Sequence, residues 1–86
     1  MSAALILQEL GGSQFQSTVN ARDFNYPRNG VSFRLARPVG GITRVTITKA
    51  DTGFTMLFYR GQEQVASANG IGQSQLRAVF AKHTGI

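Results

Sequence analysis

The chain has 86 residues, a length that allows one domain over residues 1–86. Of these residues, 42% are hydrophobic and 15% are charged, a composition that excludes a disordered chain. It has no cysteine, which excludes a disulfide framework and a thiolate metal site. Nine Lys and Arg residues and four Asp and Glu residues give a net charge of +5. This charge favours nucleic acid or an acidic protein surface as a partner. The alternative interpretation is that the charge only keeps the protein soluble.

The first predicted element is a short helix over residues 2–10. Apolar side chains recur in it at helical spacing, as Ile6, Leu7 and Leu10. Ser2 is placed to cap the first turn, and Gly11 and Gly12 can adopt the left-handed conformation that ends a helix. Because two turns of helix are not stable alone, this helix must pack against the rest of the domain.

The next segment, residues 14–20, alternates along the chain. Phe15, Ser17 and Val19 fall on one side and polar residues fall on the other. This period of two predicts a first β-strand. Residues 21–26 are expected to continue the extended chain after a bend.

A hairpin is predicted at Asn29-Gly30, because this dipeptide favours the type I′ turn, in which both central residues have positive φ. With this turn, Tyr26 would face Phe33 across the hairpin, and Phe24 would face Leu35. Since the turn type sets the register, this assignment fixes the pairing of the first hairpin.

Three strands with a clear alternation are predicted over residues 31–37, 43–49 and 54–59. A hairpin that closes across residues 50–53 pairs Val45 with Phe58 and Arg44 with Tyr59. The apolar and polar faces stay separate in this register, whereas a slip by one residue would exchange them. The predicted inner face consists of Val31, Phe33, Leu35, Val45, Ile47, Phe54, Met56 and Phe58.

Two further elements complete the expected fold. Residues 63–69 are poor in β-branched residues and predict a weak fifth strand at the sheet edge, which would also allow a homodimer by sheet extension. Residues 73–85 predict a C-terminal helix that ends at Gly85. We therefore expect a two-layer α+β domain, an antiparallel sheet of four to five strands with an N-terminal and a C-terminal helix packed on one face (α-β-β-β-β-(β)-α).

The titratable residues do not predict an enzyme. The single histidine and the four carboxylates form no carboxylate pair, metal-ligand spacing or nucleophile motif. Asp51 suits the turn in which it lies, and His83 suits the last helical turn, where a cation complements the helix dipole. We expect no catalytic residue, no metal site and no cofactor.

The outer face of the predicted sheet is the first candidate binding surface. Arg34, Arg44 and Tyr59 would lie on it among serine and threonine residues. Arginines that meet phosphates and a ring that stacks on bases are features of domains that hold single-stranded nucleic acid. Such domains use two or three aromatic residues, whereas this face offers one, so a solvated face of good strand formers is the alternative interpretation.

The segment around the first hairpin turn is the second candidate. Arg22, Tyr26, Arg28 and Asn29 would lie on an exposed rim, and such residues are common in recognition loops. The alternative interpretation is turn formation alone.

Several short segments occur in order along nearly the whole chain: ELGGSQF, ARDF, VSFRL, GITRVTIT and VFAKHTGI. Together they resemble a family of small uncharacterised proteins of phages and other mobile elements. That family carries an ELGG–F start, a TGAKNF-like segment, an SF-x-L strand, a GI-x-RV-x-IT strand and a closing VF-x-x-HTG. The chain departs from this pattern at TVNARDF, where TGAKNF is usual. The resemblance implies a phage or mobile-element origin and brings no function with it.

The sequence thus favours a non-enzymatic binding domain that holds nucleic acid through the basic sheet face or the loop. An accessory or inhibitor protein that acts on a host protein through protein–protein contacts is the alternative. No membrane contact is expected, because no stretch approaches the roughly 20 apolar residues of a membrane span and the N-terminus lacks the basic region of a signal peptide. The expected location is the cytoplasm of a bacterial host.

Overall fold

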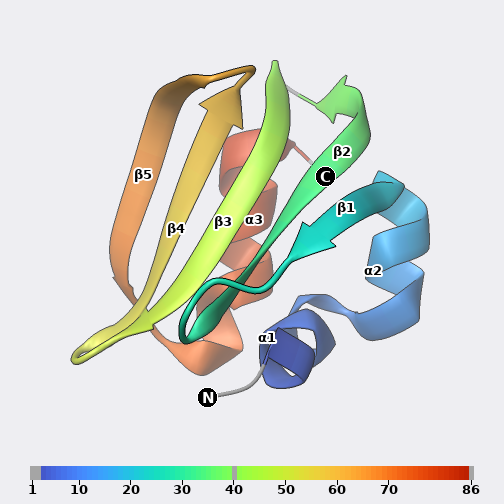
Figure 1. Cartoon of the computed structure of the whole chain (residues 1–86). Helices are drawn as coiled ribbons and strands as arrows, with labels where there is room; N and C mark the ends of the chain where they lie inside the picture. The colour runs from blue at the N-terminus through green and yellow to red at the C-terminus, as the bar shows by residue number, and fades with distance from the viewer. Residues whose placement is uncertain (1–2, 40, 86) are drawn as a thin grey trace.

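The computed structural model describes residues 3–39 and 41–85, and its architecture is α+β, as predicted (Figure 1). Five antiparallel strands form one sheet in chain order: β1 (Ala21–Asn25), β2 (Gly30–Val39), β3 (Ile42–Ala50), β4 (Gly53–Arg60) and β5 (Glu63–Ile71). The helices are α1 (Ala3–Leu10), α2 (Gly12–Val19), the short 3-10 helix η1 (Gln73–Gln75) and α3 (Leu76–Thr84). The predicted cap at Ser2 lies outside the described residues.

The helices cover one face of the sheet, and the hydrophobic core lies between the two layers (Figure 1). All eight residues of the predicted inner face are buried. Phe15 of α2 joins the layers, because its ring meets Phe33 of β2 edge-on at 6.0 Å and Phe80 of α3 at 4.9 Å between ring centroids. The opposite face of the sheet is therefore left for solvent or a partner.

The predicted strand over residues 14–20 is wrong, because this segment is helical and belongs mainly to α2. Phe15 and Val19 are four residues apart, a spacing that places two side chains on one side of a strand and also of a helix. Both are buried, whereas Ser17, the third residue of the predicted alternation, is exposed. Asn20 ends α2 in the left-handed conformation at φ 55°, a cap that the sequence could have indicated.

The predicted pairing of the first hairpin is also wrong. The observed partners are Ala21 with Leu35, Arg22 with Arg34 and Asn25 with Ser32. Tyr26 therefore does not face Phe33, and Phe24 does not face Leu35. Instead, the ring of Phe24 packs at a tilt on that of Phe33, with 5.8 Å between centroids.

The turn before β2 explains this difference. A type I′ turn requires positive φ at both Asn29 and Gly30, but of these two residues only Asn29 has it, at φ 61°. The Gly30 N–H donates instead to the Pro27 carbonyl at 3.0 Å. Gly30 instead serves the close approach of β3. A Cβ at Gly30 would overlap the carbonyl oxygen of Ile47 and lie 2.8 Å from Cγ2 of Thr48.

The predicted β3–β4 hairpin is confirmed in its register. Val45 pairs with Phe58, and Arg44 pairs with Tyr59. Both faces of this hairpin are sorted as the alternation predicts, with the apolar partners buried. β2 extends beyond its predicted end at residue 37 to Val39, with a shift of register against β3 after Arg34.

The predicted fifth strand and C-terminal helix are both present, but the strand extends from residue 69 to Ile71, and the first three residues of the predicted helix form η1. β5 pairs with β4 and forms one edge of the sheet among the described strands. α3 ends at Gly85, which adopts φ 81° and donates its N–H to the Ala81 carbonyl at 2.7 Å. The His83 ring stacks on Phe58 with 4.5 Å between centroids. No helix of the described residues is long and apolar enough to cross a membrane.

Candidate nucleic-acid interface

A row of side chains crosses the uncovered face of the sheet. Arg22 is paired with Arg34, Arg34 with Arg44, and Arg44 with Tyr59, on four neighbouring strands. Because directly paired residues of antiparallel strands share a face, these four side chains stand in line. With a strand spacing of about 4.8 Å, the line is roughly 14 Å long. These four residues are termed the arginine–tyrosine row.

The row joins residues from both predicted candidate surfaces. Arg34, Arg44 and Tyr59 lie on the outer sheet face, where the alternation places them. Arg22 was predicted on the rim of the loop, but β1 brings it into line with Arg34. Tyr26 and Arg28 stay apart from the row, on the exposed turn between β1 and β2.

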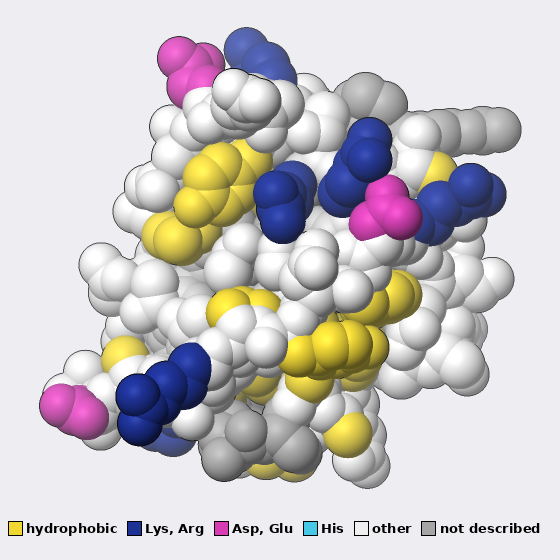
Figure 2. Space-filling model, in the orientation of Figure 1, with side chains coloured by type: hydrophobic (Ala, Val, Ile, Leu, Met, Phe, Trp, Pro, Cys, Tyr) yellow, Lys and Arg dark blue, Asp and Glu magenta, His cyan; other side chains and the backbone are white. Residues whose placement is uncertain are grey.

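The three arginines of the row are exposed, and Tyr59 is half-buried. Figure 2 shows this face of the molecule, on which Lys and Arg side chains gather over β1 to β3 beside an acidic side chain. Arg22, Arg34 and Arg44 are in register on these three strands. Asp23 of β1 forms an ion pair with Arg34, with 3.1 Å between its Oδ2 and a terminal nitrogen of the arginine.

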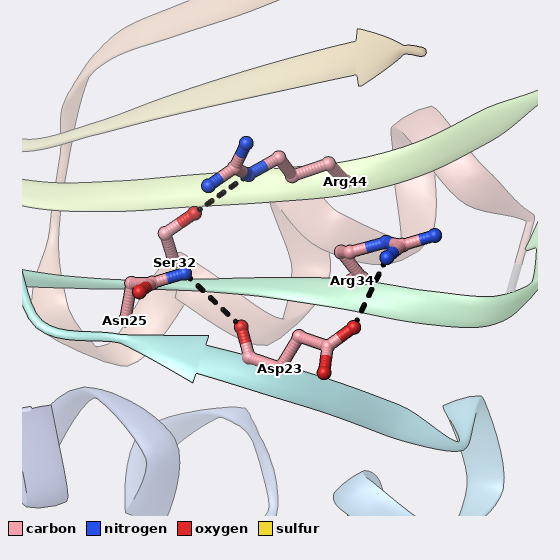
Figure 3. A network of polar contacts seen from close by, with 5 residues as sticks. All are labelled: Asp23, Asn25, Ser32, Arg34 and Arg44. Atoms are coloured by element: carbon pink, nitrogen blue, oxygen red, sulfur yellow. Dashed lines mark hydrogen bonds and ion pairs between the residues drawn. The ribbon is translucent and has the colours of Figure 1, made fainter.

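Arg44 is held in place by a small polar cluster (Figure 3). Its Nε donates to the hydroxyl of Ser32 at 3.1 Å, and the hydroxyl of Thr46 donates to the same oxygen at 3.1 Å. Ser32 is only 4% exposed, so its oxygen is a fixed acceptor beneath the arginine. Among the described residues, the two terminal nitrogens of Arg44 have no hydrogen-bond partner, so they can donate to a ligand.

A β-bulge brings Asp23 to the end of the row. Between Arg22 and Asn25 the register of β1 shifts against β2, and Asp23 has φ 53°. Asn25 donates from Nδ2 to the Asp23 carbonyl at 3.3 Å (Figure 3). The Asp23 and Arg34 side chains are 61% and 66% exposed, so their ion pair adds little to stability. Sequence reasoning missed this carboxylate, because a bulge is visible only once the strand register is known.

A hollow of about 290 Å³ opens at the same end of the row. Its lining consists of Arg22, Asp23, Arg34, Leu35 and Ala36. Two arginines and one aspartate thus line a space on the molecular surface. The hollow offers hydrogen-bond donors and an acceptor side by side.

The turn between β1 and β2 is the other predicted surface. Residues 26–29 are all exposed, and the Tyr26 side chain is the most exposed large hydrophobic group of the described residues, at 66%. No group of three or more His, Asp or Glu side chains in the described part of the chain could hold a metal ion.

Comparisons with family models, curated proteins and solved structures found no match for the chain. The phage and mobile-element family that the segments resemble therefore stays a prediction from the sequence. What the chain binds has to be inferred from the residues of its surface.

Proposed function

We propose that the chain is a non-enzymatic domain that binds single-stranded nucleic acid along the arginine–tyrosine row. The observation that carries this proposal is the direct pairing of Arg22 with Arg34 and of Arg34 with Arg44. Like charges directly opposite each other destabilise a sheet. Of the carboxylates in the described residues, only that of Asp23 forms an ion pair with this row. A phosphate backbone would neutralise the remaining charge and relieve the repulsion.

A single strand suits this face better than a duplex. Tyr59 stands next to Arg44 at the β4 end of the row, so a base can stack on its ring while phosphates meet the guanidinium groups. The bases of a duplex are already stacked on each other and cannot reach such a ring. The net charge of +5 supports the same class of partner. A phage or mobile-element origin belongs to this proposal and rests on the resemblance of the segments.

Arginine and tyrosine variants of the row should fail in different ways. In Arg44→Ala, we expect weaker binding of every single-stranded sequence, with the slope of log affinity against log salt reduced by about 0.7 per lost phosphate contact. In Tyr59→Ala, we expect a loss of about 1–3 kcal/mol of binding free energy with an unchanged slope, because stacking releases no counterion. Fluorescence anisotropy with a labelled oligothymidine at several salt concentrations measures both quantities.

Arg28→Ala is the matched control, because it removes the same charge from the exposed turn, away from the row. Its salt slope should stay close to that of the parent. If Arg28→Ala and Arg44→Ala change the slope equally, the binding is diffuse attraction to the whole surface. If the folded Arg44→Ala and Tyr59→Ala proteins bind as the parent does, the row is only a solvated face.

The exposed turn favours a second candidate, an accessory or inhibitor protein that contacts a host protein. The observation is the 66% exposure of Tyr26, since exposed tyrosine and arginine side chains are typical anchors of protein interfaces. This candidate predicts that the parent protein binds no oligonucleotide even at low salt.

A further inference from the structure

The β1 end of the row contains a group that phosphate binding does not explain. The Asp23 carboxylate lines the hollow together with Arg22 and Arg34. A carboxylate repels a phosphate, and its bond to Arg34 occupies a donor that a phosphate would otherwise use. A ligand that matches the groups of this hollow would offer hydrogen-bond donors to Asp23 as well as an acceptor to an arginine.

The carboxylate has room for such a ligand. Its Oδ2 accepts from Arg34 at 3.1 Å, whereas Oδ1 has no hydrogen bond among the described residues. A carboxylate has about four acceptor positions, so both oxygens can accept further donors while the ion pair remains. The Asp23 carbonyl accepts from the side chain of Asn25, a contact within the bulge, and the carboxylate itself is oriented by its bond to Arg34. The hollow of about 290 Å³ is well above the roughly 10–15 Å³ that one water molecule needs on the same measure, so a group much larger than water can enter it.

We infer that this hollow is a guanine-recognition subsite at the end of the arginine–tyrosine row, an inference that rests on the proposed function. The Watson–Crick edge of guanine carries an acceptor, O6, next to two donors, N1–H and the N2 amino group. Asp23 can accept from both donors, and an arginine of the hollow can donate to O6. Thymine and uracil offer one donor between two acceptors, whereas adenine and cytosine place an acceptor next to their amino group.

Binding of two oligonucleotides of about 12 nucleotides tests this inference. One is oligothymidine and the other alternates guanine with thymine. We expect the parent protein to bind the guanine-containing strand about tenfold more tightly, within the discrimination of one bidentate base contact. Replacing guanine by inosine removes the N2 amino group and should give an intermediate affinity.

Asp23→Asn should change the two affinities in opposite directions. Loss of the negative charge raises the affinity for both oligonucleotides. For the guanine-containing strand, loss of the paired acceptors outweighs this gain, so its affinity falls. Asparagine tolerates the positive φ of 53° at this position, so the variant should keep the bulge. Its preference for guanine over inosine should disappear.

Glu63→Gln is the control, because it removes the same charge from an exposed position at the start of β5. It should leave the preference for guanine unchanged. Equal gains for both strands in Asp23→Asn would overturn the inference, since Asp23 would then act through charge alone. If the parent protein binds both oligonucleotides equally, the inference about guanine is wrong, but the proposed function is not affected. If neither strand binds, both proposals fail.

Discussion

Replacing Phe33 by alanine is expected to lower the free energy of unfolding by about 3–5 kcal/mol. Phe33 is fully buried on β2, and its ring contacts those of Phe15 and Phe24, which come from α2 and β1. The substitution would leave a cavity where the helices meet the sheet. Because domains of this size are marginally stable, we expect most of the variant to be unfolded at room temperature, as measured by urea denaturation followed by circular dichroism.

Tyr26→Ala is the control for this prediction, because the Tyr26 side chain is 66% exposed on the turn before β2. Its unfolding free energy should stay within about 0.5 kcal/mol of the parent. If Phe33→Ala unfolds at the same urea concentration as the parent, the assignment of the two faces of β2 is wrong.

Gly30→Ala is expected to destabilise the protein by about 1–3 kcal/mol, although it adds one methyl group. The new Cβ would overlap the carbonyl oxygen of Ile47 and lie 2.8 Å from Cγ2 of Thr48, so β2 and β3 would have to separate at their pairing. In a thermal melt, each kcal/mol corresponds to a decrease in Tm of about 4–8 °C for a domain of this size.

Gly72→Ala provides the comparison, because the nearest atom to its Cβ is the flexible Oε1 of Gln75 at 3.4 Å. Gly72 has φ −69°, which alanine adopts without strain, so we expect a Tm close to that of the parent. Equal Tm values for the two glycine variants would show that β3 does not approach Gly30 as closely as the structure indicates.

The parts of the fold that the sequence predicts best are those where two signals agree. In the β3–β4 hairpin, the alternation of side chains and the turn over residues 50–53 select the same register, and the pairing of Arg44 with Tyr59 follows from it. Arg34 lies beside them because β2 has the same alternation. Three of the four residues of the arginine–tyrosine row could therefore be placed on one face from the sequence.

The remaining features depend on contacts between segments. Phe15 and Val19 fit a strand or a helix equally well, and the packing of the Phe15 ring between β2 and α3 favours the helix. The glycine of Asn29-Gly30 suggests a type I′ turn, but its role is to admit the backbone of β3. The extra residue in β1 that brings Arg22 into the row and Asp23 to its end leaves no pattern in the sequence.

A salt titration of the parent protein with a single-stranded oligonucleotide tests nucleic-acid binding by the row most directly. Each arginine has several N–H donors, so Arg22 and Arg34 can each contact a phosphate while one of them also donates to a base in the hollow. If Arg22, Arg34 and Arg44 each contact one phosphate, log affinity should fall with log salt with a slope of about −2, since each contact on a single strand contributes about −0.7. A slope near zero, or no binding at low salt, would contradict nucleic-acid binding by the arginine–tyrosine row.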